Sequence, residues 1–141
     1  MRHYTGNITP QDNVIFVFGS NPQGIHGAGA ARTAHHLFGA VYGVGEGLQG
    51  RSYAIPTKDL RLPGTRTISR DTIREGIRRM YGCAREHPDL EFRIAYRNTY
   101  SKTLNGYTGI EMIRLFIDAG PIPENVCISE EWHRTGMFDN L

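Results

Sequence analysis

The stretch that most constrains the fold joins an apolar run to a glycine-rich segment and then to an alanine-rich one, over residues 14–40. Residues 14–18 are apolar at every position, which is typical of a strand covered on both faces. Residues 27–38 have helical spacing of apolar positions and predict a helix. The predicted helical stripe consists of Ala28, Ala31, His35 and Phe38.

Strand-like and helix-like segments alternate along the rest of the chain. Further strands are predicted over residues 51–57, 91–97 and 125–129, and helices over 69–86 and 108–121. Thr72 with Glu75, and Thr108 with Glu111, have the spacing of capping boxes. Such alternation is typical of an α/β fold, a three-layer α/β/α sandwich with a mostly parallel or mixed central sheet. The length of 141 residues predicts a single domain over residues 1–141.

Composition narrows the functional classes. The chain is 39% hydrophobic and 21% charged, and it contains no apolar run near the ~20 residues of a bilayer span. Its first residues lack the apolar core of a signal peptide, so we expect a cytoplasmic protein with no membrane partner. Cys83 and Cys127 lie far apart among apolar neighbours, which favours buried reduced thiols over a disulfide or a metal pair.

The positive charge comes mostly from arginine, which accounts for 14 of the 16 basic residues. The densest cluster lies on the outer face of the predicted helix over residues 69–86. A solvated helix face is the simpler interpretation, and a nucleic-acid surface is the alternative. The cluster consists of Arg74, Arg78, Arg79 and Arg85.

The glycines between the first long strand and its helix suggest an anion site. Gly24, Gly27 and Gly29 would leave backbone N–H groups bare at a helix N-terminus, where a phosphate can bind. The alternative is that these glycines serve a tight turn and close packing. A Walker loop is excluded because no Lys-Ser or Lys-Thr follows. The dinucleotide pattern in "GVGEGLQG" precedes a strand, so we interpret it as accidental, in a loop whose Glu46 could close over a ligand.

Other chemistries have weaker support. The histidines show no metal-ligand spacing, so neither a metal nor another cofactor is expected. His26 lies inside the glycine loop, where it could bind phosphate, shuttle a proton or be a plain loop residue. Helix packing is expected for His35 and solvent exposure for His36. Trp132 could stack on an adenine or anchor the end of the chain.

Three stretches, "FGSNPQGIHGAGAA", "SYAIPTKD" and "LNGYTGIEMIRLF", resemble the macrodomain superfamily, in particular a small bacterial and phage branch that resembles ADP-ribosyl-acceptor hydrolases. The similarity spans residues 14–129. It implies a three-layer sandwich that binds ADP-ribose at the carboxyl ends of the strands. Some members of the superfamily remove ADP-ribose from proteins or nucleic acids.

The resemblance also implies which residues bind. Residues at the end of the first long strand and in the glycine loop, here the first group, would contact the distal ribose and a phosphate. A second phosphate loop would span residues 98–107, and its binding residues form the second group. Related chains carry a Gly-Cys-Gly stretch where this loop has bulkier side chains. The first group is Ser20, Asn21, Gly27, Ala28 and Gly29, and the second is Ser101, Lys102, Thr103, Asn105 and Gly106.

Lys58 matches a lysine that attacks the opened ribose in the hydrolysing branch. The aspartate that assists it there has Asn105 as its counterpart, which cannot act as a general base. The resemblance therefore implies Lys58 as the catalytic residue, with Asp59 or His26 handling protons. We expect the chain to bind ADP-ribose or a related nucleotide and to hydrolyse an ADP-ribosyl bond of a protein or nucleic acid. The alternative is a non-catalytic binding module, or sponge, for an ADP-ribose-derived or cyclic nucleotide signal.

Overall fold

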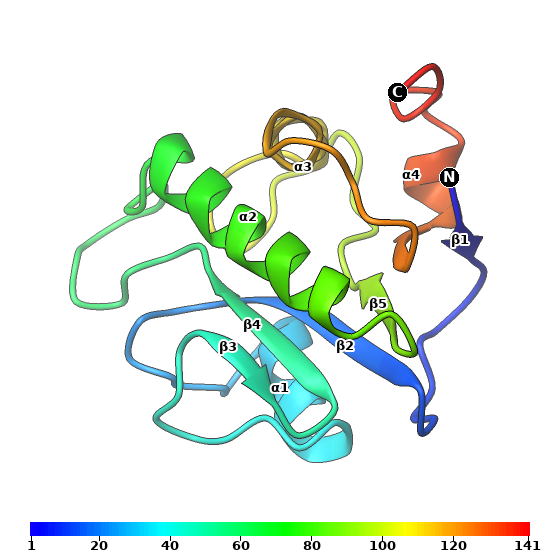
Figure 1. The fold of residues 1–141 in the computed structure, drawn as a ribbon. Helices are drawn as coiled ribbons and strands as arrows, with labels where there is room; N and C mark the ends of the chain where they lie inside the picture. The colour runs from blue at the N-terminus through cyan, green and yellow to red at the C-terminus, as the bar shows by residue number, and fades with distance from the viewer.

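The strand β2, Val14–Ser20, runs through the centre of the fold in the computed structural model, which describes residues 1–141 (Figure 1). Its side chains alternate between two cores, since Ile15 and Val17 belong to the larger and Phe16 and Phe18 to the smaller. A strand apolar at every position can bury both faces only between two layers of helices. The predicted central strand is therefore confirmed.

The sheet has six strands in the order β1-β6-β5-β2-β4-β3. All neighbouring pairs are parallel except β3 with β4. The prediction of a mostly parallel or mixed sheet is confirmed, although β1 and β3 were not anticipated. The remaining strands are β1 His3–Tyr4, β3 Gly47–Gln49, β4 Ser52–Pro56, β5 Glu91–Ile94 and β6 Val126–Ser129.

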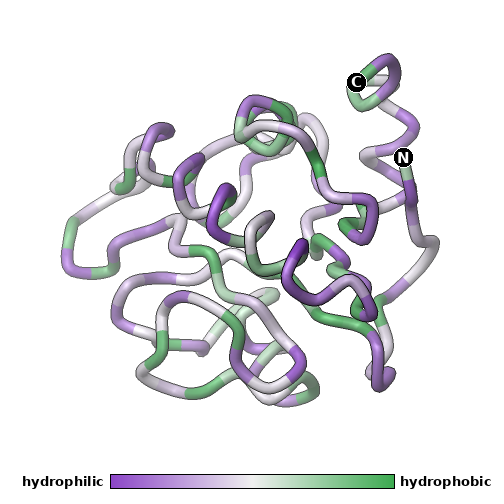
Figure 2. Tube along the Cα trace, viewed as in Figure 1, coloured by the Kyte–Doolittle hydropathy of each residue, from purple (hydrophilic) through white to green (hydrophobic).

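Helices cover both faces of this sheet (Figure 1). The helix α1, Gly29–Leu37, packs on one face, while α2, Arg70–Glu86, and α3, Gly109–Asp118, pack on the other. A short α4, Glu130–His133, follows β6. In Figure 2, α2 alternates between hydrophilic and hydrophobic positions, as expected of a helix with one buried face. None of the helices is both long and apolar enough to cross a membrane.

Helix ends agree with the sequence only in part. At α3, Thr108 and Glu111 form the predicted capping box. At α2 the cap is instead Ser69, whose hydroxyl accepts from the Thr72 N–H, so the predicted Thr72 box is wrong. The helix α1 begins at Gly29, two residues later than predicted, because the backbone before it stays extended at Ala28. His35 is exposed, contrary to the packing role predicted for it, and bonds the Ala40 carbonyl.

Three of the four arginines in the α2 cluster are paired with acidic residues of the chain. Arg74 and Arg78 pair with acidic residues one turn earlier, and Arg79 pairs with Glu46. Arg85 donates to the Pro121 carbonyl. These contacts favour the solvated helix face over a nucleic-acid surface, because paired guanidinium groups have less free charge to offer to phosphates. Both cysteines are free thiols, as predicted, and Cys127 is buried while Cys83 is only partly so.

Candidate functional site

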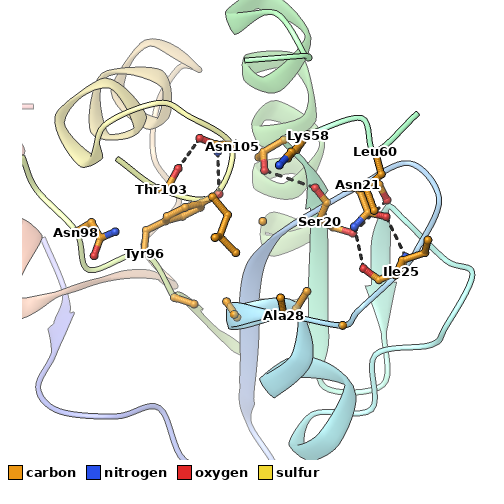
Figure 3. Close-up of a pocket in the computed structure, with 18 of the residues that line it drawn as sticks. Ser20, Asn21, Ile25, Ala28, Lys58, Leu60, Tyr96, Asn98, Thr103 and Asn105 are labelled. Atoms are coloured by element: carbon orange, nitrogen blue, oxygen red, sulfur yellow. Dashed lines mark hydrogen bonds between the residues drawn. The ribbon is translucent and has the colours of Figure 1, made fainter. Parts of the chain in front are cut away.

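A cleft of about 570 Å³ opens where β2, β4 and β5 end and α1 begins (Figure 3). The parallel register brings these ends together, since Ser20 pairs with Pro56 and Val17 with Ile94. Loops that leave the carboxyl ends of parallel strands are the usual ligand-binding edge of an α/β sheet. The lining comes from residues 19–21, 25, 27–31, 57–58, 60, 95–98 and 103–105.

The glycine loop presents bare backbone to this cleft. Gly27 and Ala28 are exposed, and their N–H groups donate to no other group of the chain. A Cβ at Gly27 would meet nothing closer than the Ile25 side chain at 4.0 Å, so no side chain blocks the loop there. The loop leads directly into the N-terminus of α1, where the helix dipole favours negative charge.

Two other residues of this loop hold its shape. The Asn21 amide donates to the Ile25 carbonyl at 2.8 Å and its oxygen accepts from the Ile25 N–H at 2.9 Å. Gly24 has a φ of +68°, and a Cβ there would collide with the backbone of Gly43 and Val44. The glycines therefore serve both purposes that the sequence left open: close packing at Gly24 and open backbone at Gly27.

Lys58 and Asp59 follow β4 and separate there. Lys58 lines the cleft, half-buried, and forms no ion pair. Asp59 lines a second cavity, of about 520 Å³, together with Glu46 and Arg79. Hydrogen bonds from the Arg61 side chain and backbone, and one from Gln23, hold the pKa of the Asp59 carboxyl well below its usual range. A carboxylate so occupied is a poor proton acceptor and does not face Lys58.

His26 does not reach the cleft either. Its side chain is buried beside Phe18, with Nε2 at 3.0 Å from the Val41 carbonyl oxygen. Nδ1 is buried without a partner. The ring thus joins the glycine loop to the segment after α1, and the structure does not bring it together with Lys58.

The second predicted loop contributes only part of its residues. Thr103 and Asn105 line the cleft, whereas Ser101 and Lys102 are exposed outside it. Gly106 is buried with a φ of +90°, and a Cβ there would collide with the Thr65 side chain. Glycine is required at position 106 by the close approach of Thr65 and not by a ligand.

Tyr96 is the main residue of the cleft that the sequence did not single out. It follows β5 and lines the cleft, with its phenol oxygen accepting from the Asn105 amide at 3.4 Å (Figure 3). Burial raises the pKa of this phenol, and hydrogen bonds with Thr57 and Asn105 lower it by less. The sequence signal for Tyr96 was its position, because it is an aromatic residue two positions after the end of a parallel strand, at the same edge of the sheet as Ser20 and Lys58.

The charged side chains that line the cleft are all positive. Lys58 and Arg97 are its charged side chains, and no aspartate or glutamate lines the cleft. Arg97 is already bonded to Glu131 at 2.8 Å, which leaves Lys58 as the free cation. Hydroxyls and amides supply the polar remainder, and Ile25, Leu60 and Leu104 supply exposed apolar surface. The cleft therefore suits an anionic ligand that carries hydroxyl groups and one apolar face.

No group of three or more His, Cys, Asp or Glu side chains is placed to hold a metal ion. The cleft is thus built from backbone N–H groups, hydroxyls, amides and one free lysine. Comparison of the chain with models of protein families, with curated proteins and with solved structures finds no match.

Proposed function

We propose that the cleft binds ADP-ribose or a closely related nucleoside diphosphate sugar. The observation that carries this proposal is that Gly27 and Ala28 line the cleft just before the N-terminus of α1 and that their N–H groups have no partner within the chain. Backbone N–H groups and a helix dipole together form a ready anion site, and a phosphate is the anion that they fit best. Lys58, which follows β4 and lines the same cleft, adds a positive charge.

Size and lining support a ligand larger than phosphate. A volume of about 570 Å³ falls within the range of small-molecule sites. Ser20, Thr57 and Thr103 place hydroxyls around the cleft for a sugar, and apolar side chains offer a surface for a base. The resemblance of the glycine loop and of "YAIPTKD" to macrodomains favours ADP-ribose among the nucleotides of this size.

Binding without turnover is better supported than hydrolysis. Hydrolysis of an ADP-ribosyl bond needs a group that moves protons within reach of the sugar. Asp59 faces the second cavity, His26 is buried elsewhere, and Asn105 cannot take a proton. Lys58 is the one residue of the proposed catalytic set that lines the cleft. The non-catalytic module is therefore our first proposal, with hydrolysis through Lys58 as the alternative.

Calorimetric titration with ADP-ribose, with AMP as the control ligand, tests the proposal. Gly27→Glu places a carboxylate in the anion site without strain, because a Cβ fits there. Gly27→Gln has the same shape and no charge. We expect the wild type to bind ADP-ribose, Gly27→Glu to lose binding at least tenfold, and Gly27→Gln to lose much less. No binding of ADP-ribose by the wild type, or equal losses in both variants, would contradict the proposed anion site.

Incubation with an ADP-ribosylated protein separates the two alternatives. A binding module retains the modified protein and releases no ADP-ribose, and Lys58→Ala then changes affinity alone. Release of ADP-ribose by the wild type that Lys58→Ala abolishes would establish the hydrolase instead.

A further inference from the structure

Tyr96 lines the cleft, and its phenol group lies in a space that exists because the neighbouring residue, Gly19, has no side chain. Its phenol oxygen lies over the α-carbon of Gly19, where any Cβ would collide with it. Gly19 has no positive φ, so backbone conformation does not require glycine at this position. The glycine is thus explained by the space that the phenol needs. Nothing in a plain β-strand would otherwise favour glycine at this position, the next-to-last of β2.

The ring of Tyr96 is held firmly from behind. It lies parallel to the buried Trp132, with ring centroids 5.9 Å apart, and edge-on to Phe116. Trp132 is itself fixed by a hydrogen bond from its indole N–H to the Asn98 carbonyl at 2.7 Å. The phenol therefore presents its hydroxyl at a defined point of the cleft and does not swing between positions.

The Tyr96 hydroxyl can donate a hydrogen bond as well as accept one. Asn105 uses its oxygen for the Tyr107 N–H and the Thr103 hydroxyl, so only its amide N–H groups face Tyr96. The phenol oxygen is thus an acceptor in this contact. Its other hydrogen-bond partner is the Thr57 hydroxyl, which itself donates to the Ser20 carbonyl at 3.5 Å, so a ligand hydroxyl would compete with Thr57 for the phenol proton. Burial raises the pKa of Tyr96, which keeps the phenol neutral and able to donate at physiological pH.

We propose that Tyr96 determines specificity: its hydroxyl donates a hydrogen bond to the sugar that lies beyond the diphosphate of the ligand. The proposal rests on the proposed function. Phosphates would take the open N–H groups before α1, whereas Tyr96 lies among the hydroxyls at the ends of β2 and β4. Ser20 directly follows Gly19, and the Thr57 side chain approaches the same α-carbon. A site built to bond a sugar hydroxyl discriminates strongly against a ligand that lacks it.

Paired titrations with ADP-ribose and ADP test the inference, because ADP lacks the distal sugar and has a terminal phosphate in its place. The wild type should prefer ADP-ribose. Tyr96→Phe removes the hydroxyl and keeps the ring, although the Asn105 amide also loses its acceptor. We expect it to weaken ADP-ribose binding about three- to tenfold, as for one hydrogen bond, while ADP binding stays unchanged. Tyr81→Phe is the matched control, since it removes another buried phenol hydroxyl, bonded to the Phe116 carbonyl in the core. It should lower thermal stability and leave the ratio of the two affinities as in the wild type.

Gly19→Ala gives an independent variant, because its methyl group displaces the phenol without removing it. It should also reduce the preference for ADP-ribose over ADP. A thermal melt of each variant checks that it is folded. An unchanged ratio in both Tyr96→Phe and Gly19→Ala would overturn the role of Tyr96 while leaving the phosphate site intact. A wild type that binds ADP and ADP-ribose equally would overturn it as well. A wild type that binds neither ligand would overturn the proposed function and this inference together.

Discussion

Lys58 and Asp59 are neighbours in the chain, yet they line two different cavities. Lys58 lies at the end of β4 in the cleft, while Asp59 turns to the side of the sheet that α2 covers. There the Asp59 carboxylate accepts from Gln23 and Arg61, and Gln23 in turn accepts from the Leu60 N–H at 3.0 Å. Asp59 therefore ties the glycine loop to the loop after β4. Its carboxylate is thus occupied in holding these two loops together, in a different cavity from Lys58.

Removing the Lys58 charge should weaken binding of an anionic ligand. We expect Lys58→Ala to reduce the affinity for ADP-ribose about tenfold, since a charge-assisted hydrogen bond contributes about 1.5 kcal/mol or more. Lys102→Ala is the matched control, because Lys102 is exposed outside the cleft. Titration of both variants with ADP-ribose at two salt concentrations measures the two losses of affinity. Equal losses for the two variants would mean that general positive charge attracts the ligand.

Asp59 should make the stability of the protein depend on pH in acid. Its pKa is lowered in the folded protein, so its contribution is fully present above the ordinary value of about 4 and is lost as the pH falls toward the folded value. The difference in melting temperature between the wild type and Asp59→Asn should be largest at neutral pH and should shrink below about pH 4. Asp89→Asn, which removes an exposed carboxylate without an ion pair, is the control for the loss of one negative charge. A constant difference across this range would mean that Asp59 is not held as an ion.

Elements with strong local signals could be predicted from the sequence. The apolar run of β2 predicts a strand buried on both faces, and the apolar stripe of α2 predicts a helix with one buried face. The four residues of that stripe, Ile73, Ile77, Met80 and Ala84, are all buried. Short edge elements have no such signal. The strand β1 has two residues, and its position depends on pairing with β6, more than a hundred residues away in sequence. The strand β3 has three residues and pairs with β4 across a two-residue turn, so its signal is local but short.

The sequence predicts which backbone segments meet at the site but not which of their side chains line it. That Ser20, Lys58 and the glycine loop share one edge follows from parallel strands. Which side chain faces the cleft depends on the last residue of each strand, because side chains alternate between the faces. A shift of one position separates Lys58 from Asp59. Tyr96 was missed because its role depends on Gly19, a contact between strands that no local pattern reveals.

Glu111 connects the loop before α2 to the start of α3. It accepts from Arg66 and Arg70, and both guanidinium groups lie over the Tyr107 ring. It also caps α3 by accepting from the Thr108 N–H, and this bond, with the two arginines, lowers its pKa. Glu111→Ala should therefore lower the free energy of unfolding by about 1–2 kcal/mol, as for loss of a cap.

Urea unfolding of Glu111→Ala, with Glu75→Ala as control, measures this effect. Glu75 pairs only with Arg78 on the exposed face of α2, so its loss should cost less than about 0.5 kcal/mol. Glu111→Gln keeps a side chain that can cap and should fall between the two. Equal effects of the two alanine variants would show that the bridge to the loop contributes nothing.

Gly27 and Gly29 are two residues apart in the same loop, yet alanine should act differently at each. Gly29 has a φ of +57°, a conformation that disfavours an L side chain by about 1–2 kcal/mol. A Cβ there would also lie 2.9 Å from Leu104 Cδ1, but Leu104 is 68% exposed and can move away. Gly27 has neither constraint.

We therefore expect Gly29→Ala to lower the free energy of unfolding by about 1–2 kcal/mol, chiefly through backbone strain. Gly27→Ala should leave it unchanged or raise it slightly, because alanine reduces the entropy of the unfolded chain. Urea unfolding of both variants, and of Gly29→Ala combined with Leu104→Ala, separates the two causes. If the loss vanishes once Leu104 is truncated, the contact with Leu104 and not the φ angle is what requires glycine before α1.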